Sequence, residues 1–306
     1  MFRFFVKRFC DSLMVLLCLL TITFFMIRFV PGGPFDQETN LSETTLQNLS
    51  KFYGYDQPIH KQYFTYIKHL VCGDFGPSLR YPGYTVNQLL KERIPVSFEL
   101  GLWAILMALT LGGTCGIFAA IYHNRWIDKM LMSGCLFGIS LPTFVLGPII
   151  ILIFSLKLGW CQAIGWDSWN DRILPTLTLS CMYAGYIARL IRTSCLDVLS
   201  QPFIRTAFAK GLGPIRIFIF HVIKNALGPV LTYLGPTTAA IMSGSLVIES
   251  LFQIPGAGSL FISAVNQRDT ALLLGTVLYF AVLILLLNFL VDLAVCFCNP
   301  KQRFQC

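Results

Sequence analysis

Six long apolar stretches, almost free of charge, run through this 306-residue chain and constrain its fold more than any other feature. A helix needs about 20 consecutive apolar residues to cross the hydrocarbon core of a bilayer. Each stretch is long enough, and the fourth is short because Arg189 and Arg192 bound it. The sequence therefore predicts an all-α polytopic membrane protein with six transmembrane helices, at about residues 9–30, 100–121, within 130–156, and at about 173–190, 227–248 and 270–291.

Composition argues against several other classes of protein. Only 12% of residues are charged and 55% are hydrophobic, whereas a soluble domain carries about 25% charged residues. This balance disfavours a cytosolic globule, a disordered chain and a nucleic-acid-binding interpretation of the net charge of +8. The eleven cysteines are odd in number and lie mostly in apolar stretches, so we interpret them as small hydrophobic residues. Pairing of the two outer ones, Cys72 and Cys161, stays open.

The first apolar stretch resembles a signal peptide, because Arg3, Lys7 and Arg8 precede it. However, no alanine occurs before Ala104, so no A-x-A cleavage motif follows the apolar core. We therefore expect this stretch to be retained as the first transmembrane helix.

Lys and Arg in the flanks set the orientation of a membrane protein. With a cytoplasmic N-terminus, the inner segments hold 13 Lys or Arg and 4 acidic residues, a net charge of +9, while the outer parts carry −1. Six of those 13 basic residues lie in one loop, between Arg189 and Lys224. The sequence thus predicts a multi-pass membrane protein with both termini in the cytoplasm.

The segments between the spans divide the chain into four predicted parts. They are the N-terminal tip with the first span (1–30), an extracytoplasmic loop (31–97), a core transmembrane domain (98–298) with a cytoplasmic loop at 189–228, and a cytoplasmic tail (299–306).

The outer loop has its own helical pattern. Asp56 and Pro58 suit a helix start, and Gly73 suits its end. Between them, one face of the predicted helix carries the apolar or aromatic residues Ile59, Tyr63, Tyr66, Ile67 and Leu70. A weaker pattern of the same kind precedes it at Leu46, Leu49 and Tyr53. The loop could cap the outer helix ends, dock an extracytoplasmic partner, or do both.

The inner loop predicts a short helix between two prolines. Pro202 suits a first helical turn, Gly211 a helix end, and Pro214 the start of a second helix. The small residues of this helix, Ala207 and Ala209, would let a partner approach closely, and they lie among apolar and basic side chains. The whole candidate docking helix comprises Phe203, Ile204, Arg205, Thr206, Ala207, Phe208, Ala209, Lys210 and Gly211. Such a helix could fill a groove of another protein or lie on anionic lipid.

This loop resembles the cytoplasmic EAA loop of ABC importer permeases, in the form found in the dipeptide, oligopeptide and nickel group. The similarity begins with RTAFAKGL at 205–212 and KNALGPVL at 224–231. It continues through RFVPGGPF at 28–35, GDFGPS at 73–78, VIESLFQIPGAG at 247–258, NQRD at 266–269 and NPKQRF at 299–304, and so covers the chain in order. Arg205 and Thr206 depart from the general pattern, which begins with Glu and Ala, whereas Ala207 and Gly211 keep it.

The resemblance implies a type I ABC importer permease fold in the bacterial inner (plasma) membrane, in which the inner-loop helix docks on an ATPase. The implied partners are a similar second permease, two cytoplasmic ATPase subunits and an extracytoplasmic peptide-binding protein, in a lipid bilayer and without nucleic acid. The chain has no G-x-x-x-x-G-K-[ST] loop. We therefore expect a transport subunit with no catalytic residue, metal or cofactor of its own, and ATP and Mg on the ATPases.

Two alternatives belong to other classes. An ion-coupled secondary peptide transporter needs carboxylates or histidines deep in its spans, and here Asp11, Glu249, Asp269 and Asp292 lie at span ends. A membrane enzyme needs a motif such as H-E-x-x-H or G-x-S-x-G, which the sequence lacks. The cargo stays open among oligopeptides, dipeptides, nickel chelates and glutathione.

Other residues near the spans have two interpretations each. Glu249, with Arg268 and Asp269, could form an outer gate or contact a binding protein, but a hydrated loop carboxylate is the preferred interpretation of Glu249. The prolines in or near the spans could act as hinges or be merely tolerated; they are Pro142, Pro148, Pro175 and Pro236. Gly112, Gly113 and Gly116 predict close helix packing.

Overall fold

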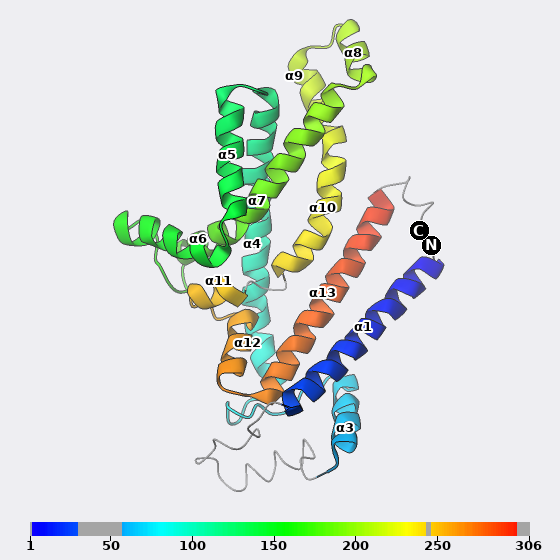
Figure 1. Ribbon diagram of the computed structural model, residues 1–306, viewed down its shortest axis with the longest axis vertical. Helices are drawn as coiled ribbons and strands as arrows, with labels where there is room; N and C mark the ends of the chain where they lie inside the picture. The colour runs from blue at the N-terminus through cyan, green and yellow to red at the C-terminus, as the bar shows by residue number, and fades with distance from the viewer. Residues whose placement is uncertain (1, 30–56, 243–245, 299–306) are drawn as a thin grey trace. The chain divides into compact units, whose positions relative to one another are not determined.

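The computed structural model describes residues 2–29, 57–242 and 246–298, and these are helical almost throughout (Figure 1). The predicted all-helical fold is confirmed. In chain order the elements are α1 (Phe2–Phe29), α3 (Ile59–Val71), α4 (Val86–Ile121), α5 (Trp126–Ser140), α6 (Thr143–Ile150), η1 (Ile151–Lys157), α7 (Trp169–Leu199), α8 (Pro202–Ala209), α9 (Pro214–Ile217), η2 (Phe218–Ile223), α10 (Lys224–Met242), α11 (Leu246–Leu251), α12 (Ala257–Asn266) and α13 (Thr270–Cys298). The two η elements are π-helices.

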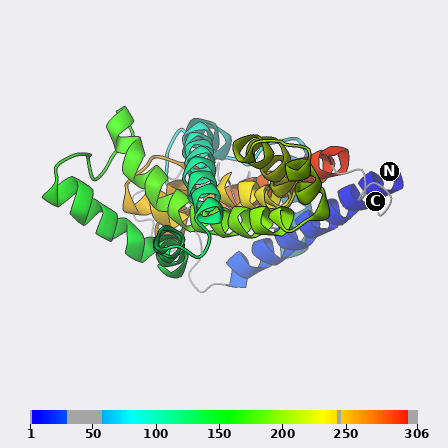
Figure 2. The same ribbon diagram turned by 90° about the horizontal axis from the view of Figure 1, so that it is seen from above.

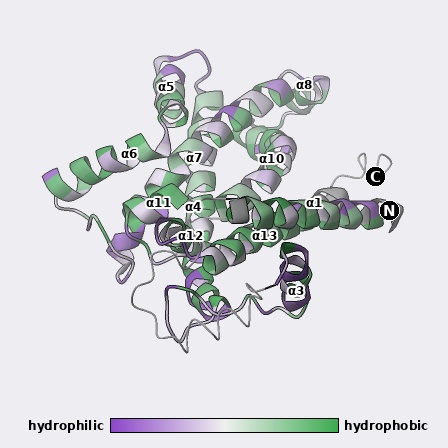
Figure 3. Cartoon of the chain, turned by 60° about the horizontal axis from the view of Figure 1, so that its bottom comes forward, coloured by the Kyte–Doolittle hydropathy of each residue, from purple (hydrophilic) through white to green (hydrophobic). Residues whose placement is uncertain are grey.

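Four helices in the described part of the chain are long and apolar enough to cross a membrane, or five if one bent pair counts as a single span. Two of them, α4 and α13, contain the second and sixth predicted segments, and a third, α1, covers the first segment up to Phe29. The fourth is the run Pro214–Met242 through α9, η2 and α10, which contains most of the fifth segment. Figure 3 shows apolar residues along α1 and α13, whereas polar residues gather on α3.

The third predicted segment, residues 130–156, is not one straight helix. It is divided between α5 and the α6–η1 helix, which are bent by 113°. Pro142 lies at the break: it has no N–H with which to continue α5. Its carbonyl oxygen accepts hydrogen bonds from Val145 and Leu146, at 2.9 and 3.0 Å, and so begins α6. The sequence offered Pro142 as a possible hinge but favoured simple tolerance and a single span, because the apolar stretch continues on both sides of the break.

The fourth predicted segment, residues 173–190, lies inside α7. This helix has 31 residues, ample length at a rise of about 1.5 Å per residue. It is less apolar than the four helices above, because charged residues lie near both of its ends and small or polar residues fill its buried side. The total of six spans therefore stays a prediction.

Two compact units make up the chain, and each is described by itself. The first comprises residues 1–97 and 255–286. In it α1, α3 and α13 share a core of leucines and aromatic rings. The ring of Phe24 stacks on that of Tyr66 with centroids 5.8 Å apart, and Tyr63 meets Phe24 edge-on at 5.4 Å. The four-part domain division made from the sequence stays a prediction.

The predicted outer-loop helix is present as α3. It follows Pro58 and ends before Gly73, whose φ of +75° suits a glycine. Of the expected face, Tyr63, Tyr66, Ile67 and Leu70 pack in the core, whereas Ile59 is half exposed. The start signal at Asp56 and the weaker pattern at Leu46, Leu49 and Tyr53 lie outside the described residues.

The second unit comprises residues 98–254 and 287–306. Its part of α4 lies beside α5 and α7, as Figures 1 and 2 both show. Glycine brings the backbones together: a Cβ at Gly112 would lie 2.5 Å from the carbonyl oxygen of Ala184, and one at Gly116 equally close to that of Ala188. Close packing is therefore confirmed at these two glycines, whereas Gly113 faces open space.

Candidate functional site

The inner-loop helix, α8, is closed at its end by hydrogen bonds that require glycine. Gly211 has a φ of +80°, which L side chains rarely adopt. Its N–H donates to the carbonyl oxygen of Phe208 at 2.9 Å, and the N–H of Leu212 donates to that of Ala207 at 3.3 Å. This pair of bonds is a Schellman motif, and Leu212 packs against the buried core beside it. The predicted helix end at Gly211 is confirmed.

The inner face of α8 belongs to the core of the second unit. Ile204 and Ala207 are only 2% and 8% exposed. They lie in one cluster with Ile191 of α7, Ile217 of α9 and Val222 of η2. The expectation that Ala207 lets a partner approach is therefore wrong, because Ala207 fits α8 against its own chain. Movement of α8 would be passed directly to these helices.

The outer face of α8 is free in the described chain and mixes apolar rings with positive charge. Phe203 and Phe208 are 45% and 50% exposed. Arg205, Thr206 and Ala209 are exposed between them, as are Lys210 and Gly211 at the end of the helix. The predicted apolar anchors and basic residues thus share one surface, which suits a groove with an acidic rim.

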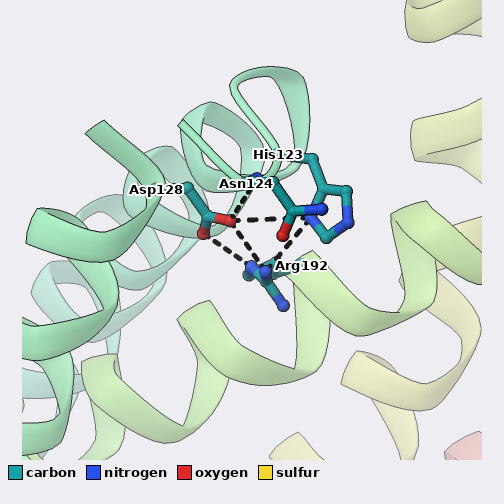
Figure 4. Close-up of polar contacts among 4 residues, drawn as sticks. All are labelled: His123, Asn124, Asp128 and Arg192. Atoms are coloured by element: carbon teal, nitrogen blue, oxygen red, sulfur yellow. Dashed lines mark hydrogen bonds and ion pairs between the residues drawn. The ribbon is translucent and has the colours of Figure 1, made fainter. Parts of the chain in front are cut away.

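An ion pair joins α5 to α7 (Figure 4). Arg192 donates from Nε to Oδ1 of Asp128 and from Nη2 to its Oδ2, both at 2.7 Å. The N–H of Asn124 adds a bond of 2.9 Å to Oδ2, and His123 Nδ1 lies 3.5 Å from the same oxygen. The Asp128 side chain is only 4% exposed. This bidentate contact fixes the start of α5 against α7.

Sequence reasoning missed this pair. Asp128 and Arg192 were used only to orient the chain, and they stand 64 positions apart. The one available signal was an acid placed among basic residues in the short turn at 122–129.

The other end of α7 carries a second polar cluster. Ser168 and Asp171 form a capping box. The hydrogen bonds that Asp171 accepts there, of which the bond from the Ser168 backbone N–H has the largest effect, hold the pKa of Asp171 below its usual range. The Nε of Arg172 lies 3.0 Å from Oε1 of Glu99. The guanidinium carbon of Arg172 lies over the ring of Trp169, 4.7 Å from the ring centroid. This cluster borders a pocket of about 420 Å³ between α4 and α7, whose wall includes two tryptophans that the sequence reasoning did not single out, Trp103 and Trp169.

Asp269 is a buried carboxylate of the first unit. Its Oδ1 accepts a hydrogen bond from the N–H of Leu272 and so caps α13. Its Oδ2 accepts bonds from the Ser78 hydroxyl and from the N–H groups of Leu79 and Arg80. Arg268 beside it is exposed, with a φ of +54°. Asp269 therefore fastens a loop to a helix, and only Arg268 of the two is open to a partner.

Glu249 belongs to the second unit and is fully buried in α11. The preferred interpretation, a hydrated loop carboxylate, is wrong. The sequence placed Glu249 at the outer end of a span, but α10 ends at Met242 and a separate helix carries Glu249 into the interior. Within the described ranges, no three His, Cys, Asp or Glu side chains gather as a metal site would require.

Comparison with known proteins decides the family. Residues 112–304 match the model of the binding-protein-dependent transport system inner membrane component, and residues 1–81 match the model of its N-terminal part. The chain belongs to this family of inner membrane transport components. The resemblance drawn from the sequence motifs is thereby confirmed.

Curated relatives match the permease chain over almost its whole length. It is 40% identical to the dipeptide transport system permease protein DppB of Bacillus subtilis, over 100% of this chain and 99% of the relative. It is 41% identical to the oligopeptide transport system permease protein OppB of Haemophilus influenzae, over 99% and 100%. The OppB of Escherichia coli matches at 40% over the same shares.

Solved structures support the fold of this family member. The MetNI methionine ABC transporter, in inward facing conformations, superimposes with a TM-score of 0.59 at 15% identity, over 69% of this chain and 97% of that one. An amino acid ABC transporter crystallised with histidines superimposes with a TM-score of 0.52 at 17% identity, over 68% of this chain and 94% of that one. The predicted ABC type I importer permease fold is therefore confirmed at the level of the fold.

Proposed function

We propose that the chain is a permease subunit of an ATP-driven importer that carries oligopeptides or dipeptides from a binding protein into the cytoplasm. Its relatives at about 40% identity are dipeptide and oligopeptide transport permeases. The observation that carries the mechanism is α8, whose buried face holds it in the core while its outer face offers Phe203 and Phe208 among basic residues.

The proposed importer has further subunits. A second, similar permease would complete the membrane part, and two ATPase subunits would hold ATP and Mg, since this sequence has no phosphate-binding loop. An extracytoplasmic protein would deliver the peptide. Exposed Arg268 is the outer residue we propose for contact with that protein, whereas buried Glu249 and Asp269 would support the outer elements.

In this proposal α8 works as a lever. ATP binding draws the ATPases together and displaces the helix docked on them. Because Ile204 and Ala207 pack with residues of α7, α9 and η2, the displacement reaches the transmembrane helices directly. The permease then passes between inward-open and outward-open states, whose populations the ATPases control.

The orientation follows from the charges. We propose that both termini lie in the cytoplasm, so that the turn before α5 and the α8 loop face the same side. In support, these two segments lie at one end of the second unit (Figure 1). In a permease whose eleven native cysteines are replaced by serine or alanine, a cysteine introduced at Thr206 should react with an impermeant maleimide only in inverted vesicles.

Copurification from the native membrane tests the docking proposal. Phe208→Asp should lower recovery of the ATPases about 30-fold, because a central aromatic anchor contributes about 2 kcal/mol or more. Ile215→Asp is the matched control, since Ile215 is 75% exposed but lies outside α8. If Phe208→Asp recovers the ATPases as well as the control, α8 is not the docking helix.

Uptake into reconstituted vesicles tests the transport proposal and its cargo. A labelled dipeptide or longer peptide should enter only with the binding protein and ATP, and unlabelled peptide should compete better than glutathione or nickel. Uptake driven by a proton gradient without ATP would instead support the secondary transporter.

A further inference from the structure

We infer that a pocket between α5 and α7 binds the phosphate headgroup of an anionic phospholipid from the cytoplasmic leaflet. The pocket has a volume of about 450 Å³ and is lined by Lys129, Met132, Ser133, Cys135, Leu136 and Arg189. The inference rests on the proposed orientation, which places the start of α5 at the cytoplasmic surface. It does not depend on the identity of the cargo.

The charge of the pocket is positive and uncompensated in the described chain. Lys129 and Arg189 reach it from α5 and α7, and its lining contains no acid. Both side chains are exposed, and neither forms an ion pair within the described ranges. Asp128, next to Lys129 in sequence, is already held by both donor groups of Arg192 at 2.7 Å. The two free cations suit a phosphate, as basic pockets between transmembrane helices do.

The arrangement along α5 follows the order of groups in a phospholipid. Lys129 lies near the start of the helix, and Met132 and Leu136 follow it at helical spacing along the pocket wall. Trp126, 70% exposed one turn before Met130, is a typical anchor at the headgroup level. A headgroup phosphate beside the cations would therefore leave its acyl chain against the apolar lining. This apolar lining favours a lipid over a free anion.

Photolabelling of the intact importer tests the site. The complex is reconstituted in nanodiscs of phosphatidylcholine containing a phosphatidylglycerol with a photoreactive headgroup, and labelled peptides are identified by mass spectrometry. We expect the label on α5 and α7 around the pocket. Each charge-assisted contact with the bound phosphate contributes roughly tenfold in affinity, so Lys129→Gln with Arg189→Gln, which removes both contacts, should weaken capture at the pocket about 100-fold.

Two controls separate the pocket from general charge. Arg216→Gln with Lys224→Gln removes the same charge from exposed residues outside the pocket, and capture should stay within about twofold. Lys129→Arg keeps a cation in place and should retain labelling, which also guards against a double variant that fails to fold.

Three results would overturn the inference. Equal loss of label in both double variants would mean only a diffuse attraction of the basic surface for lipid. Displacement of the lipid probe by millimolar inorganic phosphate or by glycerol phosphate would assign the site to a free anion. Loss of the second permease from the pocket variant, with lipid capture unchanged, would make this face a contact between subunits.

Discussion

In the second unit α4 meets α7 with Gly112 and Gly116 against alanine carbonyls, while in the first unit α1, α3 and α13 meet through aromatic rings and leucines. Lipid tails are as apolar as leucine, so two helices inside a bilayer gain little by burying large side chains against each other, and they gain from close backbone approach instead. Polar residues gather on the outer-loop helix α3 (Figure 3), which lies outside the predicted spans and exposes His60, Lys61 and Lys68. Burial of its rings Tyr63 and Tyr66 against α1 is favourable where water is the alternative. The contact of α3 with α1 thus differs from that of α4 with α7 because α3 is the partner predicted to lie outside the bilayer.

The largest expected effect is at the glycine contact. Gly112→Leu should abolish recovery of folded permease, because even its Cβ would lie 2.5 Å from a backbone oxygen that cannot yield. The loss should exceed the roughly 1–3 kcal/mol typical of overpacking. Size-exclusion chromatography in mild detergent measures it. Gly113→Leu is the matched control and should behave as wild type, since Gly113 has nothing within 4 Å; equal behaviour of the two variants would contradict backbone contact.

A smaller effect is expected at the polar joint of the first unit. Asp269→Ala would leave the hydrogen bonds to Ser78, Leu79 and Arg80 unmade, at a cost of about 2 kcal/mol or more. The freed loop should then be cut by trypsin after Arg80 much faster than in wild type. Asp167→Ala removes an exposed acid and should leave the cleavage rate unchanged; a rate unchanged in both would show that Asp269 does not hold the loop.

The aromatic contact should tolerate change better than the glycine contact. Phe24→Leu loses the stacked and edge-on contacts with Tyr66 and Tyr63 but keeps an apolar side chain, so the free energy of unfolding should fall by about 1 kcal/mol. Thermal unfolding followed by fluorescence measures the change. Phe9→Leu, at a ring that is 62% exposed, should cost less, and a reversed order would refute the comparison.

The smallest effect is expected at a hydroxyl within the aromatic core. The oxygen of Tyr66 is buried and finds no hydrogen-bond partner among the described residues, and burial raises the pKa of its phenol. Tyr66→Phe should therefore leave the free energy of unfolding unchanged or raise it slightly. A loss above about 1 kcal/mol, measured in the same unfolding assay, would reveal a partner for the hydroxyl.

The sequence predicted those parts of the fold that depend on apolar length and local chain signals. The runs that became α1, α4 and α13 were located, and α8 was placed between Pro202 and Gly211, because prolines and glycines act on their own neighbours. The break after Ser140 was missed even though a proline marked it, since an apolar run is compatible with one helix or two.

The candidate site was only partly predictable. Phe203, Phe208 and Arg205 were predicted as contact residues of the inner-loop helix and are exposed, but burial of Ile204 and Ala207 depends on α7 and η2, whose contacts the local pattern does not contain. The same holds for Asp269 and Glu249: each lies at a predicted span end, yet packing with distant segments buries both. Contacts between segments that are distant in the chain produce no periodic pattern of residues in the sequence.

The bend between α5 and α6 has a consequence for what surrounds it. Because residue 142 is a proline, the carbonyl oxygen of Gly138 cannot receive the hydrogen bond that the fourth residue along a helix normally donates. Hydrocarbon offers no donor in its place, so a lipid tail cannot be the only neighbour at this point. The end of α5 inside this apolar segment is therefore a place where water or another part of the protein has to donate hydrogen bonds to the backbone oxygens.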